Sequence, residues 1–223
     1  MKILKKILII LLIIVAILLL VIGIAFGLLK YKTNKILDDY SEIYTNEKYN
    51  KPIKIEGIEP FKQDVSCGYA VIEMFSKWNN GSITEQSLYD NYGKVVTSTG
   101  KAFEKEMNKQ FPEYKTTMYK YLSSEDLIDK VYISLSKGIP VPVEWAAKYE
   151  NEWTLHYSLI TGIDIPNDKV TIANPYGYTE EITIKEFINR TNFEAYEKMP
   201  LFLKFGFAFG FFEKNTIYII EEK

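Results

Sequence analysis

The chain contains one cysteine and one histidine, and each stands in a setting that suits a thiol nucleophile and its base. Cys67 opens an apolar helical pattern after the run Gln-Asp-Val-Ser at residues 63–66, and His156 opens a run typical of a strand at residues 156–162. A thiol at a helix N-terminus feels the positive end of the helix dipole, and a nearby imidazolium stabilises its thiolate further. The pair therefore predicts an enzyme with a cysteine nucleophile of low pKa.

Two further side chains extend this pair to a candidate catalytic set. Gln63 precedes Cys67 by four residues, and Asn174 follows the next strand-like run in the segment Asn-Pro-Tyr-Gly at residues 174–177. The motifs Gln-x-x-x-Cys-Gly-x-Ala, His-Tyr and Asn-Pro-x-Gly, in this order, resemble those of the bacteriocin-processing (C39-like) peptidases of the papain-like superfamily. The resemblance covers about residues 58–220.

The resemblance implies a papain-like fold and one role for each residue. Cys67 would attack a peptide carbonyl as the thiolate, and His156 would accept the thiol proton and later protonate the leaving amine. Asn174 would orient the imidazole, and Gln63 with the backbone N–H of Cys67 would form an oxyanion hole. Many members of this branch carry Asp before the proline, so Asn174 departs from the pattern and adds no negative charge. The substrate would be a peptide or protein, and no metal or organic cofactor is implied.

Two other functions would use the same residues. An amidase or a transglutaminase-type acyl transferase can employ this triad, because the acyl group can pass to water or to an amine. A catalytically silent, membrane-tethered module could keep the fold and use the cleft to capture peptides. Bacteriocin exporters fuse this domain to an ATP-driven transporter, but the chain has no G-x-x-x-x-G-K-[ST] run, so we expect no fused ATP-binding transporter domain and transfer no Gly-Gly leader specificity.

The N-terminal 30 residues form a candidate membrane anchor. Residues 7–29 carry no charge and are flanked by lysines on both sides. At about 1.5 Å per residue such a helix crosses a hydrocarbon core of about 30 Å. A cleaved signal peptide is the alternative, with a small-x-small site at residues 25–27. Asp38 and Asp39 favour a cytoplasmic N-terminus, which predicts a single-pass protein of the cell membrane with an extracytoplasmic catalytic domain.

Charge and cysteine content exclude several classes of function. Outside residues 1–30 the chain has 23 basic and 29 acidic residues, a net charge of −6, which does not favour nucleic acid as a partner. A single cysteine cannot form an internal disulfide or a thiolate metal site.

The remaining patterns predict a stalk at residues 31–57 and an α+β peptidase domain at residues 58–223. Helices are expected first, at residues 67–78, at about 82–91, around the stripe of Phe103, Met107 and Phe111, and at 124–136. Asp64 and Ser66 are N-cap candidates for the first helix, and Ser82 with Glu85 resembles a capping box for the second. Strands are expected afterwards, at residues 139–145, 155–163, 169–173, 179–184 and 216–220, packed as an antiparallel sheet beneath the helices.

An apolar segment at residues 199–212 has two interpretations. It contains six phenylalanines and one charged residue, Lys204. We interpret it as a core or groove-lining segment, and contact with the bilayer is the alternative because a tethered domain can place such a segment in the membrane interface.

Overall fold

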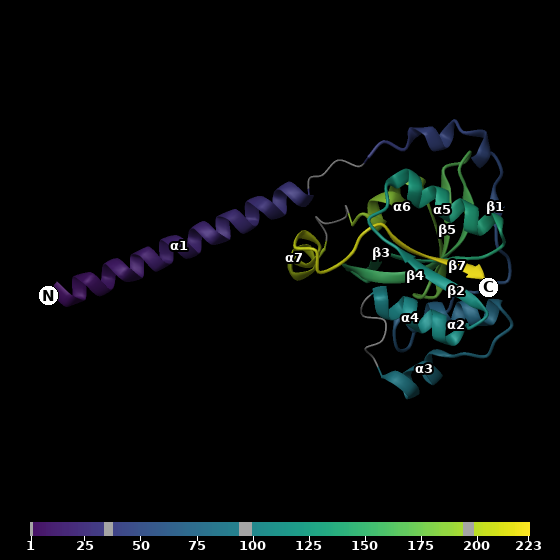
Figure 1. The fold of residues 1–223 in the computed structure, drawn as a ribbon, viewed down its shortest axis with the longest axis horizontal. Coiled ribbons are helices and arrows are strands. Elements are labelled where there is room, and N and C mark those ends of the chain that lie inside the picture. The colour runs from purple at the N-terminus through teal and green to yellow at the C-terminus, as the bar shows by residue number, and fades with distance from the viewer. Residues whose placement is uncertain (1, 34–37, 94–99, 194–198) are drawn as a thin grey trace.

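The helix α1 (Lys2–Thr33) projects away from a body built around one antiparallel sheet (Figure 1). The computed structural model of this chain describes residues 2–33, 38–93, 100–193 and 199–223. Among these residues, one helical segment, Lys5–Leu28, is long and apolar enough to cross a membrane. The α+β class predicted from the sequence, with helices on an antiparallel sheet and one apolar N-terminal helix, is confirmed.

The sheet has the strand order β2-β7-β3-β4-β5-β6, with β1 paired to β4 beside this path. Its strands are β1 (Ile53–Lys54), β2 (Tyr114–Tyr119), β3 (Val141–Tyr149), β4 (Glu152–Asp164), β5 (Lys169–Asn174), β6 (Tyr178–Ile182) and β7 (Thr216–Glu222). The helices of the body are α2 (Cys67–Trp78), α3 (Glu85–Tyr92), α4 (Gly100–Gln110), α5 (Ser124–Ser136), α6 (Ile184–Thr191) and α7 (Leu201–Ala208), with short 3-10 turns η1 (Ser41–Tyr44) and η2 (Glu47–Tyr49). The sequence analysis did not predict β1, β2, α6 or α7.

The two faces of the sheet bury two separate apolar cores. Helices α5 and α6 cover one face, and α2 and α4 cover the other (Figure 1). Side chains alternate along β4, so Ile160 joins the α5 and α6 core while Tyr157 and Leu159 join the α2 and α4 core. His156 therefore extends from the face opposite to that of Tyr157, its neighbour along the strand.

Helix α2 has the bounds predicted from the sequence. Its residues from Gly68 to Ser76 are all buried, which explains why the segment is apolar on almost every side. Ser66 is the N-cap: its backbone is extended, and its hydroxyl accepts a hydrogen bond from the N–H of Tyr69 at 3.3 Å. Asp64, the other N-cap candidate, lies two residues before the cap position.

The predicted capping box of Ser82 and Glu85 is wrong, and Glu85 has a different partner. Thr84 is the N-cap of α3, and it forms the capping box with Ser87. The buried carboxylate of Glu85 instead accepts hydrogen bonds from three successive backbone N–H groups that precede α2, at 2.8, 3.3 and 3.0 Å. These groups belong to Asp64, Val65 and Ser66, so Glu85 fixes the loop that leads to Cys67.

The prediction of a stalk at residues 31–57 is corrected by the packing of its second half. Ile43 and Tyr49 are buried in the core beneath α5, and Ile53 on β1 pairs with Ile163 on β4. The carboxylate of Asp38 accepts hydrogen bonds from the backbone and hydroxyl of Ser124 at 2.6 and 2.7 Å. The folded body therefore begins near residue 38, soon after α1 ends, and residues 34–37 lie outside the described part of the chain.

We expect the change Glu85→Ala to destabilise the domain by about 2–4 kcal/mol, because three backbone donors lose a charged acceptor in a largely buried place. The measurement is the midpoint of urea unfolding of the full chain in detergent. The change Glu59→Ala, at an exposed position shortly before the loop that Glu85 binds, is the control and should change the free energy of unfolding by less than about 0.5 kcal/mol. A loss no larger than that of Glu59→Ala would contradict the role given to Glu85.

Candidate active site

The thiol of Cys67 lies at the N-terminus of α2 against the backbone of β4. The backbone N–H groups of Tyr157, Gly68 and Cys67 itself face the sulfur. Because Tyr157 follows His156 in β4, the first turn of α2 is adjacent to the strand that carries the histidine. Among the described residues, the thiol makes no hydrogen bond to the imidazole.

His156 and Asn174 are joined directly across neighbouring strands. Strands β4 and β5 are antiparallel, and the His156 Nε2 to Asn174 Oδ1 distance is 3.0 Å. The amide oxygen also accepts a hydrogen bond from the backbone N–H of Tyr176 at 3.0 Å, which identifies it as the acceptor. The proton of the neutral imidazole therefore belongs on Nε2, and Nδ1 is left as the basic nitrogen.

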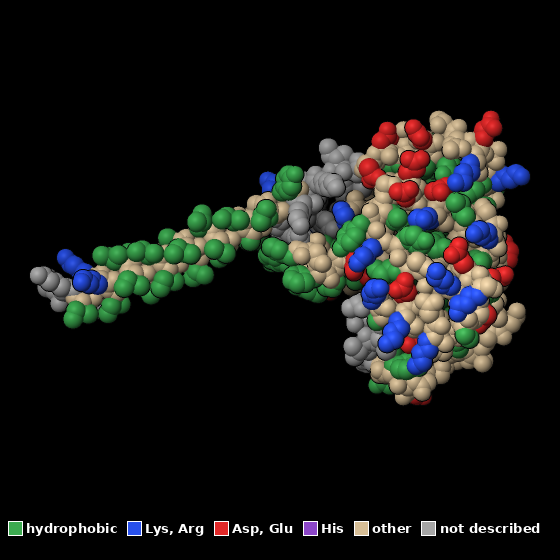
Figure 2. All heavy atoms as spheres, in the orientation of Figure 1, with side chains coloured by type: hydrophobic (Ala, Val, Ile, Leu, Met, Phe, Trp, Pro, Cys, Tyr) green, Lys and Arg blue, Asp and Glu red, His purple; other side chains and the backbone are tan. Residues whose placement is uncertain are grey.

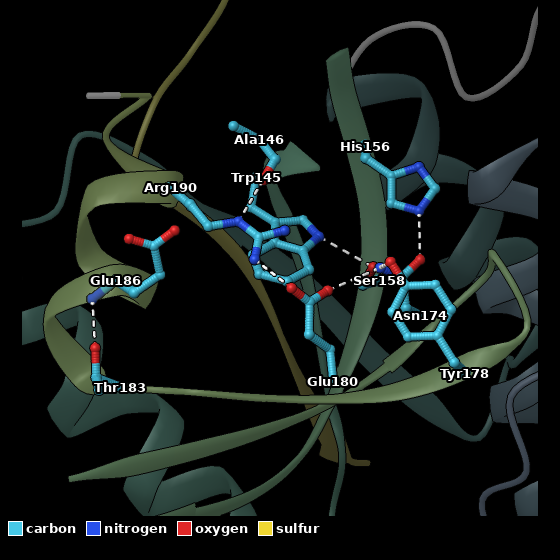
Figure 3. A network of polar contacts seen from close by, with 10 residues as sticks. All are labelled: Trp145, Ala146, His156, Ser158, Asn174, Tyr178, Glu180, Thr183, Glu186 and Arg190. Atoms are coloured by element: carbon cyan, nitrogen blue, oxygen red, sulfur yellow. Dashed lines mark hydrogen bonds and ion pairs between the residues drawn. The ribbon is translucent and has the colours of Figure 1, made fainter. Parts of the chain in front are cut away.

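An ion pair between the partly exposed Glu180 and the buried Arg190 fixes the other end of the Asn174 amide. Its Nδ2 donates to the Glu180 carboxylate on β6 at 3.1 Å, and the other oxygen of Glu180 contacts the guanidinium of Arg190 on α6 at 2.5 Å. Figure 3 shows this line of contacts from His156 through Asn174 and Glu180 to Arg190. Since Nδ2 must face a carboxylate, Oδ1 must face the imidazole, and the amide cannot rotate without losing both bonds.

Arg190 is buried and contacts both the backbone and an aromatic ring of β3. It is 4% exposed, its Nε donates to the carbonyl of Ala146 at 2.6 Å, and its guanidinium lies 3.7 Å from the ring centroid of Trp145. The indole N–H of Trp145 donates in turn to the hydroxyl of Ser158 at 3.0 Å. These contacts compensate the cost of burying a cation, so Arg190 and Glu180 form a rigid support for Asn174.

Tyr176 covers one face of the imidazole. The rings of Tyr176 and His156 are stacked with centroids 4.1 Å apart and an interplanar angle of 21°. The turn that carries Tyr176 closes through Gly177, whose φ of 92° suits glycine and whose N–H bonds to the carbonyl of Asn174. Tyr176 therefore restricts both the orientation of His156 and its access to water.

Gln63 is linked to the same turn by its backbone. Its N–H donates to the carbonyl of Pro175 at 2.7 Å, and the neighbouring Lys62 forms a β-bridge with Tyr176. The side-chain Oε1 of Gln63 is buried and has no hydrogen-bond partner in the described structure. This oxygen is available to a hydrogen-bond donor on a ligand, because a buried acceptor without a partner is otherwise costly.

The electrostatics of the site differ from the low-pKa thiolate expected from the sequence. Burial raises the pKa of the Cys67 thiol to about 11, against the opposing N–H groups, and the charge of Glu144 adds to the shift. Burial also lowers the pKa of His156 to about 4, and the positive charge of Arg190 acts in the same direction. The physical reason is that His156 is 2% exposed, so the resting pair is a neutral thiol and a neutral imidazole near pH 7.

Glu144 is an ionisable residue that the sequence analysis missed. It lies on β3 directly across from Tyr157, is 3% exposed, and its Oε2 has no partner in the described structure. Burial, together with the charge of Glu213, raises the pKa of Glu144 to about 8. The carboxylate form of Glu144, which prevails above about pH 8, is the form whose charge helps to raise the pKa of the Cys67 thiol.

An open groove of about 800 Å³ begins beside this site. Gln63 and Tyr176 line it together with the tip of the β3–β4 hairpin, residues 149–152, and the rings of Tyr149 and Tyr176 are in contact with centroids 4.9 Å apart. Within the described part of the chain, no three Cys, His, Asp or Glu side chains come together to hold a metal ion. The absence of a cofactor remains a prediction.

All four residues predicted from the sequence thus lie in one region of the fold. His156 and Asn174 are hydrogen-bonded, Gln63 is tied to the turn after Asn174, and Cys67 lies beside the strand of His156. Glu180, Arg190 and Tyr176 were not anticipated as parts of the site. Tyr176 alone was within reach, because it lies inside the quoted Asn-Pro-x-Gly motif.

Comparisons with known proteins agree with this architecture. The sequence model of the Peptidase C39 like family matches residues 55–200. The peptidase domain of Streptococcus ComA, a bifunctional ABC transporter involved in a quorum-sensing pathway, superposes with a TM-score of 0.50 at 15% identity and covers 75% of this chain and 100% of that one. A double-glycine-motif protease from an AMS/PCAT transporter, solved in complex with the leader peptide, gives a TM-score of 0.48 at 14% identity over 77% and 98% of the two chains. No curated protein matches the sequence. The predicted resemblance is confirmed.

We expect Asn174→Asp to destabilise the domain by about 2–4 kcal/mol, because a second carboxylate would face Glu180 where Nδ2 now donates. The double change Asn174→Asp with Glu180→Gln should recover at least about 1 kcal/mol of stability relative to the sum of the single changes. It moves the negative charge from position 180 to position 174 and restores a hydrogen-bond donor between the two side chains. Unfolding by denaturant measures all three variants. Glu181→Gln, at the exposed neighbouring position, is the matched control.

The same variants can be followed at the single histidine. Selective ¹⁵N labelling gives one pair of ring signals, which should report the Nε2–H tautomer and a pKa near 4 in the parent chain. In Glu180→Gln we expect a mixture of tautomers, because the carboxylate that requires Nδ2 to face it is lost and the N–H of Tyr176 alone then favours the present orientation of the Asn174 amide. Additive destabilisation and an unchanged tautomer would show that Glu180 does not position Asn174.

Proposed function

The chain belongs to the Peptidase C39 like family, and we propose that its domain is a cysteine peptidase with a catalytic set made of Gln63, Cys67, His156 and Asn174. The family assignment supports a cysteine peptidase. The hydrogen bond between His156 Nε2 and Asn174 Oδ1 carries the assignment of roles, because it leaves Nδ1 as the base. The place of Cys67 at the N-terminus of α2, beside β4, supports its role as the nucleophile.

In the proposed acylation step, Nδ1 of His156 takes the thiol proton as Sγ of Cys67 attacks the carbonyl carbon of the substrate. The proton moves as the S–C bond forms, because each partner is neutral in the free site and neither charge is favoured alone. The oxyanion accepts hydrogen bonds from the backbone N–H of Cys67 and the side-chain amide of Gln63. The imidazolium then protonates the leaving amine, and the C–N bond breaks to leave a thioester.

Deacylation reverses the sequence with water as the nucleophile. Nδ1 of His156 removes a proton from water as its oxygen attacks the thioester carbonyl. The C–S bond breaks, the sulfur recovers the proton, and a carboxylic acid is released. Asn174 keeps the imidazole in one orientation through both steps, and Glu180 keeps Asn174 in place.

The groove beside Gln63 and Tyr176 is the proposed path of the substrate chain. Its volume and its open form suit an extended peptide rather than an enclosed small molecule. Four charged side chains line it, those of Lys62, Asp64, Glu150 and Glu152. We therefore expect polar contacts along the substrate backbone and side chains in this part of the cleft.

We further propose that α1 anchors the enzyme in the cell membrane with the domain outside the cytoplasm. Segment Lys5–Leu28 has the length and composition of a single span. Lysines flank the span almost equally on its two sides, and Asp38 and Asp39, which follow it, favour a cytoplasmic N-terminus.

We expect Cys67→Ala to abolish peptide hydrolysis with nearly unchanged folding, because the covalent route is lost at the cost of one sulfur. His156→Ala should lower kcat by about 10² to 10⁴ fold, and Asn174→Ala by less, since His156 moves the proton and Asn174 orients it. Substrates can be found by comparing new protein termini in cells with the active chain and with Cys67→Ala, and kinetics then follow on those peptides.

A peptidyl electrophile separates the peptidase from a silent binding module. Rapid labelling of Cys67 that disappears in His156→Ala supports the peptidase. Binding of the peptide with no labelling, or wild-type turnover by Cys67→Ala, would refute it. A loss in Asn174→Ala equal to that in His156→Ala would mean that the third member of the triad is wrongly assigned.

The orientation is tested with protease added to intact protoplasts. We expect digestion of the domain while cytoplasmic marker proteins survive, because the domain lies outside. Protection in intact protoplasts with digestion only after lysis would place the active site in the cytoplasm. Release of the domain into the medium would favour the cleaved signal peptide.

A further inference from the structure

Helix α7 and the turn after it expose several large apolar side chains. Phe202 is 69% exposed and Phe211 77%, and Leu201 and Phe209 are about half exposed. The segment from Met199 to Phe212 contains no acidic residue. A soluble surface seldom carries so many exposed aromatic rings within one short segment, so this surface requires a partner.

The opposite side of α7 is firmly part of the domain. Met199 and Leu203 are buried in a small apolar core, with Phe207 and Phe212 packed against it. Gly206 lies directly beneath the ring of Phe212, where a Cβ atom would come within 2.1 Å of the ring. The exposed rings are therefore presented by a folded helix and the turn that follows it, and the interpretation of residues 199–212 as core holds for one side of this segment only.

The position of α7 identifies the partner. Helix α7 contacts α1, and Figure 1 shows it beside the end of α1 that is nearest the body. Figure 2 shows hydrophobic side chains along α1 and again over α7 where the two helices meet. The apolar span of α1 ends at Leu28. The exposed rings of α7 thus lie at the level where a bilayer spanned by α1 would end.

We propose that α7 and the turn through Phe212 form a membrane-docking surface, whose exposed phenylalanines enter the boundary between headgroups and acyl chains of the bilayer spanned by α1. This proposal rests on the proposed role of α1 as an anchor. Aromatic side chains favour this boundary, and an amphipathic helix lies in its plane with the apolar side down. Lys204, the only charge in the segment, can extend its ammonium to the headgroups.

Docking through α7 would also fix the position of the catalytic cleft. The core beneath α7 includes Leu155 and Ala146, and Leu155 immediately precedes His156 in β4. The folded body begins near residue 38, so little chain remains to lift the domain away from the membrane. The substrate class that fits this geometry is a peptide segment close to the membrane surface.

The test places single cysteines in the full chain on a Cys67→Ala background, with an environment-sensitive fluorophore at position 202 or 211. The proteins are reconstituted in vesicles of phosphatidylcholine and phosphatidylglycerol. Quenching by phosphatidylcholine with a spin label on the acyl chain reports contact with lipid, and iodide reports contact with water. Position 14 in α1 is the positive control, and position 89 on α3, away from α1 in Figure 1, is the aqueous control.

We expect the labels at 202 and 211 to be quenched by the spin-labelled lipid at least twofold more than the label at 89, and to be protected from iodide. Equal quenching at 202, 211 and 89, with position 14 quenched by lipid, would overturn docking while leaving the anchor intact. Failure of lipid to quench position 14 would overturn both. Protection from both quenchers with cross-linking between chains at 211 would assign the surface to a second copy. None of these results depends on peptidase activity, because every labelled chain lacks Cys67.

Discussion

The buried guanidinium of Arg190 is the constraint on which the rest of the site depends. A cation that is 4% exposed needs a countercharge and polar partners, and Glu180, the Ala146 carbonyl and the Trp145 ring supply them together. These partners come from β6 and β3, and Arg190 itself lies on α6, so one charge ties three elements of the fold to each other. Asn174 takes the remaining acceptor of Glu180, and the orientation of His156 follows from that.

The same burial sets the chemical character of the site. A charge at His156 is disfavoured by burial and by the nearby guanidinium, and a charge at Cys67 is disfavoured by burial. An imidazolium and a thiolate formed together would still stabilise each other, which makes proton transfer and nucleophilic attack parts of one event. A substrate that displaced water from the cleft would strengthen every remaining electrostatic contact there.

Local sequence patterns predicted those helices and strands whose apolar residues and caps are close together in the chain. Helix α2 was found with its bounds because an apolar stripe follows a serine cap. Strand β2 was missed because only two of its six side chains are buried, and α6 was missed because Ile182 and Ile184 were both assigned to one strand. The ion pair that holds Asn174 in place could not be predicted from local patterns, because Arg190 contacts partners that are 10 and 44 residues away in the chain. The role of Glu85 was predicted wrongly for the same reason, because the backbone N–H groups that donate to its carboxylate lie about 20 residues earlier in the chain.

Pro175 has a consequence for the lifetime of the site. Asparagine side chains slowly deamidate when the backbone nitrogen of the following residue attacks the side-chain amide and closes a succinimide ring. The nitrogen that follows Asn174 belongs to Pro175, which carries no hydrogen and cannot complete this ring. The carboxylate that deamidation would create would also face Glu180 at hydrogen-bonding distance. An asparagine whose amide must survive is thus followed by the residue that blocks its commonest route of chemical ageing.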